Sequence, residues 1–140
     1  MKNNISHFQL SDEEFTTQFK DCTLNPEVFD HEAHLRLAWI LIKDIGLVEA
    51  EKTIQEQLQN FVKSVGATDK YHLTLTIASM KAVHHFMQRS KMKNFKDFIL
   101  ENPRLKNNFK ELINSHYSIN IFASEEAKSS FLEPDLLPFQ

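Results

Sequence analysis

Glycine and proline are scarce in this chain, and their scarcity restricts the fold more than any other feature of the sequence. The 140 residues include only two glycines, Gly46 and Gly66, and four prolines. A β-sandwich or β-barrel needs many tight turns, which are usually built from these residue types. The length fits one domain. We therefore expect an all-α, single-domain helical bundle over residues 1–140, with residues 1–10 as a flexible amino-terminal tail.

Helix-start and helix-stop residues divide most of the chain into four main helices. Ser11 and Glu14 have the spacing of a capping box, Asp30 can cap the second helix, and the two glycines can end the second and third. Apolar residues recur at helical spacing between these signals. The expected helices run from Ser11 to about Asp21, His31 to about Ile45, Val48 to Ser64, and Thr68 or Asp69 to about Arg89.

The carboxyl-terminal third of the sequence predicts shorter elements. One helix is expected in NFKDFILEN, and a second begins at Pro103, with a break near Asn107 and Asn108. Ser124 can cap a last turn or two, and the remaining residues, EPDLLPFQ, are expected to be extended because prolines disfavour helix there.

Charge and cysteine content exclude several classes of function. The net charge is -3 with neutral histidines, and no face concentrates lysine and arginine, so we expect no nucleic-acid partner. No apolar run is long enough to cross a bilayer, and we expect no membrane partner. A single cysteine, Cys22, allows no intrachain disulfide, and the first residues lack the apolar core of a signal peptide. These features favour the cytoplasm.

Three histidines lie at the starts of two predicted helices. His31 and His34 open the second helix and His72 opens the fourth. If the second, third and fourth helices alternate in direction, the second and fourth are parallel, and their first turns lie at one end of the bundle. We therefore predict that these three side chains share a site, with His116 arriving from a later helix as a further ligand or proton carrier.

A metal site is one use of this trio. Residues three apart on a helix have Cβ atoms roughly 5 to 6 Å apart, which suits two imidazoles on one ion. Three neutral imidazoles and an open position suit zinc or another divalent metal, whose bound water can act in hydrolysis. The sequence thus allows a metal-dependent hydrolase or lyase with His31, His34 and His72 as ligands.

The same histidines can act without a metal. His34 or His72 could serve as a general base, or could bind a small polar ligand with contacts from the hydroxyls of Tyr71, Thr74 and Thr76. A non-catalytic binding or interaction module is the alternative function, in which the histidines are structural and the tail from Phe131 to Phe139 makes contacts.

Other polar residues have simple structural interpretations. Arg36 can form a surface ion pair with Glu32 at the four-residue spacing. His84 and His85 lie in the middle of a helix, far from His72, and we interpret them as structural. His7 falls in the expected tail. No phosphate-binding glycine loop or serine-hydrolase elbow is present.

Two segments resemble a family of small bacterial proteins. HEAHLRLAW and YHLTLT are similar to the motifs His-x-x-His-Leu-Arg-x-Ala-Trp and Tyr-His-x-Thr of that family, and the likeness spans roughly residues 29–138. The matching residues are His31, His34, Leu35, Arg36, Ala38, Trp39, Tyr71, His72 and Thr74. The family has no established activity, so the resemblance supports grouping the histidines and implies no substrate. Many members carry an acidic residue where this chain has Leu73. This departure weakens any site that needs a carboxylate at this position, as an iron site normally would.

Overall fold

The computed structural model describes residues 6–139, and in this part of the chain it contains helices and no strands. The fold is all-α, as the sequence predicts. The α-helices are α1 (Asp12–Lys20), α2 (His31–Ser64), α3 (Leu73–Met87), α4 (Phe95–Glu101), α5 (Pro103–Asn107), α6 (Phe109–Asn114) and α7 (Glu125–Ser129). Three short 3₁₀ helices are η1 (His7–Gln9), η2 (Thr68–Lys70) and η3 (Ile121–Ala123).

A bend at Gly46 divides α2 into two halves. The φ of Gly46 is 80° and its ψ is 164°, which no helical residue adopts. Positive φ is easily reached by glycine because it lacks a Cβ atom. The two helices expected at residues 31–45 and 48–64 are therefore present, joined through this residue.

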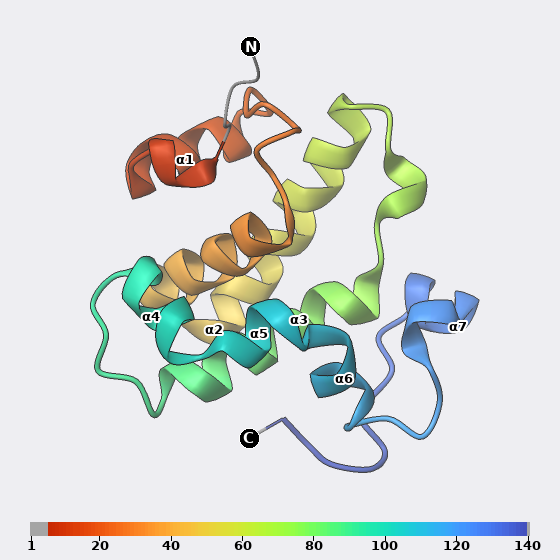
Figure 1. The fold of residues 1–140 in the computed structure, drawn as a ribbon. Helices are drawn as coiled ribbons and strands as arrows, with labels where there is room; N and C mark the ends of the chain where they lie inside the picture. Colours follow the sequence, from red (N-terminus) through yellow and green to blue (C-terminus); the bar gives the residue numbers. More distant parts are fainter. Residues whose placement is uncertain (1–5, 140) are drawn as a thin grey trace.

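The two halves of α2 and α3 form the centre of the fold (Figure 1). The first half of α2 and the whole of α3 run in the same direction, and the second half of α2 runs back towards the upper right of the view, where the chain turns through η2 into α3. Their buried faces carry the apolar stripes seen in the sequence, including Trp39, Ile54, Phe61 and Met80. This parallel arrangement is the one that the histidine prediction requires.

The start of α3 differs from the expectation. A cap at Thr68 or Asp69 was predicted, but residues 68–70 form η2 and the following backbone is extended. His72 is the actual cap, because its Nδ1 accepts a hydrogen bond from the Leu75 backbone N–H at 3.1 Å. Histidine is not among the preferred capping residues, so the propensity rule points to the earlier residues.

The short carboxyl-terminal elements follow their sequence signals. Pro103 occupies the first turn of α5, and the helix is interrupted between Asn107 and Phe109. The Ser124 hydroxyl caps α7. After α7 the described chain has no helix or strand and bends at residues 135–137 instead of staying extended as expected. It is fixed by hydrogen bonds, such as that from the Tyr117 hydroxyl to the Leu132 carbonyl at 2.7 Å.

The amino-terminal residues depart from the prediction of a flexible tail. His7 is fully buried, and its Nε2 lies 2.9 Å from Glu32 Oε1. Residues 1–5 of the expected tail lie outside the described part of the chain. The exposed Lys106 also pairs with Glu32, at 3.0 Å.

Arg36 is buried rather than paired with Glu32 on the surface, which corrects the sequence interpretation. Its guanidinium donates to the carbonyls of His7 and Leu10 at 2.6 and 2.9 Å and to Asp12 at 2.8 Å. These partners precede Arg36 by more than twenty residues, so helical spacing does not reveal them. We call His7, Asp12, Glu32 and Arg36 the amino-terminal cluster.

Among the described helices, none has a stretch long and apolar enough to cross a membrane.

Candidate functional site

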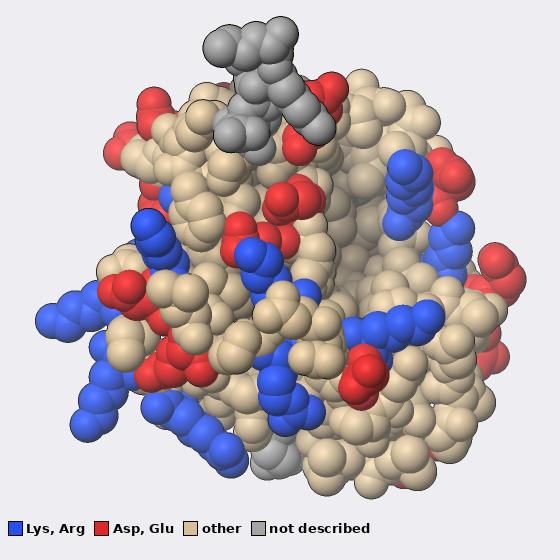
Figure 2. Space-filling view, viewed as in Figure 1, with Lys and Arg blue, Asp and Glu red and all other residues tan. Residues whose placement is uncertain are grey.

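A cavity of about 460 Å³ opens beside the first turns of α2 and α3. Figure 2 shows a hollow on this face, and its visible walls are mostly neither acidic nor basic. The second half of α2 supplies one wall, and residues near α6 and η3 close another. The apolar lining residues are Pro26, Phe29, Leu58, Phe61, Val62, Val65, Ala67, Leu75, Phe109 and Phe122.

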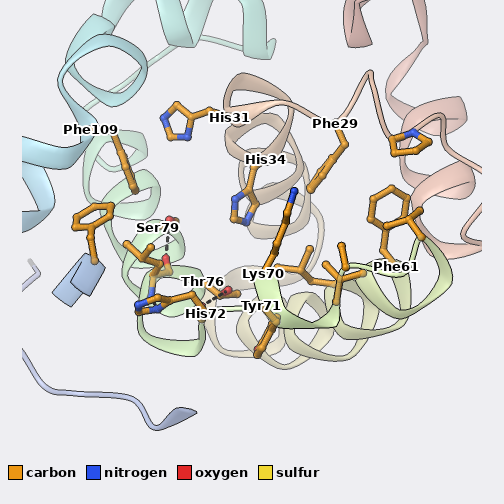
Figure 3. A pocket seen from close by; sticks show the side chains of 17 residues that line it. Phe29, His31, His34, Phe61, Lys70, Tyr71, His72, Thr76, Ser79 and Phe109 are labelled. Atoms are coloured by element: carbon orange, nitrogen blue, oxygen red, sulfur yellow. Dashed lines mark hydrogen bonds between the residues drawn. The ribbon is translucent and has the colours of Figure 1, made fainter. Parts of the chain in front are cut away.

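All three predicted histidines line this cavity. In Figure 3, His34 extends downwards from α2, His31 points sideways towards Phe109, and His72 lies across the cavity at the start of α3. The parallel course of the first half of α2 and of α3 brings their first turns to one end of the bundle. The predicted topology therefore brings the three side chains to one cavity, while their hydrogen-bond partners differ from one another.

His72 has both ring nitrogens occupied within the protein. Nδ1 caps α3, and Nε2 donates to the Ile121 carbonyl at 2.9 Å. This pattern fixes the neutral tautomer with its proton on Nε2 and leaves no lone pair for a metal. His72 thus joins the start of α3 to η3 and forms a wall of the cavity.

His31 is held at the rim of the cavity. It is exposed, its Nε2 donates to the Leu105 carbonyl at 2.9 Å, and its ring lies 4.7 Å from the Phe109 ring. One nitrogen, Nδ1, has no protein partner in the described chain and can meet solvent or a ligand.

His34 differs from the other two because its Nε2 is buried and makes no hydrogen bond within residues 6–139. The residue as a whole is only partly covered, but this atom is closed off from solvent. Burial, followed by the nearby His31, lowers the pKa of His34 to about 4. The ring is therefore neutral at pH 7, and a buried polar nitrogen without a partner costs free energy.

Tyr71 provides a second buried polar atom of this kind. Its hydroxyl has no hydrogen-bond partner in the described chain. Burial raises the pKa of this hydroxyl, and Gln59 and Thr76 lie near enough to lower it slightly without meeting hydrogen-bond geometry. Two cavity-lining residues thus each have a buried polar atom without a partner in the described chain, where folded proteins leave few such groups.

Other polar groups of the cavity are already bonded. The Thr76 hydroxyl donates to the His72 carbonyl at 2.7 Å and the Ser79 hydroxyl to the Leu75 carbonyl at 2.6 Å. Each oxygen can still accept a hydrogen bond from a ligand. Lys70 is exposed and extends along the cavity in Figure 3. No aspartate or glutamate lines the cavity.

Two predicted site residues lie elsewhere. Thr74 is fully buried, and its hydroxyl donates to the Ser130 carbonyl at 2.8 Å and accepts from the Leu132 N–H at 3.1 Å, so it fixes the chain after α7. His116 lies at a separate pocket near the end of α3, with its Nδ1 2.6 Å from the Leu137 carbonyl. The short helices do not return His116 to the cavity, which corrects the prediction.

The histidine trio does not form a ligand set around one position. Within residues 6–139, no three histidine, cysteine, aspartate or glutamate side chains are grouped as a metal ion would require. His72 could bind an ion only after losing a hydrogen bond that it now makes. Zinc or another divalent metal on these residues stays a prediction that metal analysis must test.

The sequence interpretation also missed several cavity residues. Phe29, Phe61 and Phe109 line the cavity and belong to no motif that indicates chemistry. Ser79 follows Thr76 and His72 at helical spacing, so the stripe on this face of α3 was a usable signal.

Comparison with protein-family models, curated proteins and solved structures gives no match for this chain. The site must therefore be interpreted from its own geometry.

Proposed function

We propose that this protein binds a small, largely apolar molecule in the cavity beside His34, and that the ligand carries one polar group. The unpartnered His34 Nε2 is the observation that carries this proposal. A ligand hydroxyl or carbonyl in hydrogen-bond reach would satisfy it, and Tyr71, whose buried hydroxyl is also unpartnered in the described chain, lines the same cavity and is proposed as a second contact.

The cavity wall supports the apolar character of the ligand. Four phenylalanine rings and several aliphatic side chains surround a volume within the usual range of about 300 to 1,000 Å³ for ligand pockets. A few placed polar groups in such a lining normally fix the orientation of the ligand.

The charge of the lining argues for a neutral or anionic ligand. Lys70 is the one permanently charged residue in the lining, and no carboxylate is present to pair with a cation. A ligand with a buried ammonium group would leave that charge unpaired, which is costly.

Binding is favoured over catalysis by the state of the histidines. A general base works best with a pKa near the operating pH, and the pKa of His34 lies at about 4. His72 is committed to two backbone hydrogen bonds. We therefore place the non-catalytic binding module ahead of the metal-dependent hydrolase or lyase, with the cytoplasm as its proposed location.

The proposal is tested with three ligands of similar shape that differ in their polar group: benzyl alcohol, toluene and benzylammonium. Titrations followed by ¹H–¹⁵N NMR should show shifts clustered at Phe29, Tyr71 and Leu75. Benzyl alcohol should bind about tenfold more tightly than benzylammonium, because the cation finds no counter-charge. Absence of clustered shifts for all three ligands up to about 10 mM would contradict the proposal.

The test variant is His34→Leu, and its matched control is His84→Leu. His84 lies on α3 and does not line the cavity. Binding of benzyl alcohol should weaken in the first variant and stay unchanged in the second. Metal content of tag-free protein is measured in parallel, and about one equivalent of zinc that is lost in His34→Leu would support the metal-dependent function instead.

A further inference from the structure

A second pocket, of about 320 Å³, lies at the opposite end of α3 from the cavity. Residues of α3, α5, α6 and the end of the chain contribute to it. Its basic groups are His85, Arg89, Arg104 and His116, and no aspartate or glutamate is among its lining residues. None of these groups has a role in the proposed function.

The distribution of arginine makes this pocket distinctive. The chain has thirteen lysines and three arginines. Arg36 is hydrogen-bonded within the amino-terminal cluster, and both other arginines line this one pocket. Within residues 6–139 neither Arg89 nor Arg104 makes an ion pair or a side-chain hydrogen bond, so both guanidinium groups are free to bind a ligand.

The four groups repel one another when they are charged. Burial, Arg89, His116 and His84 together lower the pKa of His85. The His116 Nδ1–H donates to the Leu137 carbonyl, so its Nε2 is left for another partner and donates to an anion when the imidazole is protonated. An anion between these groups would relieve the repulsion and accept their hydrogen bonds.

The remaining walls of the pocket are apolar. Phe86 and Leu112 come from the helices, and Leu137 and Phe139 come from the end of the chain. The Phe139 ring is stacked on His116 at 4.0 Å between centroids, which fixes the imidazole against this wall. The ligand thus needs an apolar part beside its charged group.

From these observations we infer a second binding site, at which Arg89, Arg104 and His116 bind an organic oxyanion whose apolar part packs on Phe86 and Phe139. The planar guanidinium group presents paired N–H donors that match the oxygens of a carboxylate or a phosphate. Both head groups share this chemistry, and the test compares them.

Phenyl phosphate and benzoate are titrated into the full chain, followed by ¹H–¹⁵N NMR, with inorganic phosphate and phenol as controls for the separate parts. At least one of the two organic anions should shift resonances of Phe86, Arg89, Arg104 and His116. It should bind more tightly than phosphate or phenol alone. No binding of either organic anion up to about 10 mM, or equal binding of phenol, would overturn the inference.

Three charge-removing variants locate the contact: Arg89→Gln, Arg104→Gln and Lys93→Gln. All three residues are exposed, and Lys93 does not line the pocket. Each arginine variant should weaken binding of the organic anion by about tenfold, and Lys93→Gln by less than about twofold. Equal weakening by all three would show diffuse attraction and would overturn the site.

Discussion

The first turns of α2 carry polar side chains on two faces, and the two faces differ in whether these side chains find hydrogen-bond partners in the described protein. On one face, Arg36 donates to two carbonyls and to Asp12. On the other face, His34 points into the cavity with its Nε2 unpartnered in the described chain. Both groups are buried, so the contrast lies in whether the protein itself supplies their partners.

This contrast separates structural polar groups from binding groups. The amino-terminal cluster is complete within the protein and joins residues 7–12 to α2. At the cavity the same kind of burial is left uncompensated at His34 and Tyr71. Unpaired buried groups lower stability, and a ligand can supply what the fold omits.

The largest expected effect is on the amino-terminal cluster, whose polar groups find their partners within the protein. Arg36→Met leaves the carbonyls of His7 and Leu10 and the carboxylate of Asp12 without their donor. We expect the free energy of unfolding to fall by about 4 kcal/mol. Urea denaturation at pH 7 measures this change, and a loss below about 1 kcal/mol would show that the cluster does not hold the amino terminus.

The second effect is a pH dependence that arises from His34. Its pKa is about 4 in the folded protein and about 6.5 when unfolded, so the unfolded chain binds the proton more readily. The stability contributed by the neutral ring is therefore complete above pH 6.5 and is lost as the pH falls towards 4. The difference amounts to about 3 kcal/mol.

Comparison with His34→Leu isolates this pH effect, because burial also lowers the pKa of His7 and acts in the same direction. Between pH 7 and pH 4 the wild type should lose about 3 kcal/mol more unfolding free energy than the variant. Parallel curves for the two proteins would mean that His34 is not buried in its neutral form.

A smaller effect of opposite sign is expected for His34→Leu at pH 7 without ligand. Leucine removes the unpartnered nitrogen and keeps an apolar side chain in the lining, so the unfolding free energy should rise by about 1 kcal/mol. His84→Leu is the control and should change stability by less than about 0.5 kcal/mol. A clear destabilisation by His34→Leu would place His34 with the structural groups.

The smallest expected effect is that of Tyr71→Phe. Loss of the unpartnered hydroxyl should raise the unfolding free energy by about 0.5 kcal/mol, and it should weaken the binding of benzyl alcohol. Thermal unfolding with and without the test ligand measures both changes. A drop in stability would indicate that the hydroxyl already has a structural partner.

Local signals in the sequence predicted much of the fold and part of the site. The capping residues Ser11 and Ser124 and the interruption of the helix at Gly46 depend on neighbouring residues alone, and all three are present, although α2 continues beyond Gly46 after a bend. His31, His34 and His72 line one cavity because the helix directions follow from short connections. These are inferences that one chain can support without knowledge of distant contacts.

Contacts between distant residues account for what the sequence could not predict. Arg36 and Thr74 bond to backbone carbonyls 29 and 56 residues away, and every residue type carries a carbonyl, so no spacing identifies these partners. The position of His116 depends on the turns between several short helices. The hydrogen bond that occupies the His72 Nε2 is made with the Ile121 carbonyl, 49 residues away.

The most direct test of the account measures the coupling between the ligand head group and His34. The affinities of benzyl alcohol and toluene are determined by NMR titration for the wild type and for His34→Leu. We predict that the wild type prefers benzyl alcohol by about tenfold and that the variant loses this preference, to within about twofold. An equal preference for benzyl alcohol in both proteins would contradict the claim that His34 is held unpaired for a ligand.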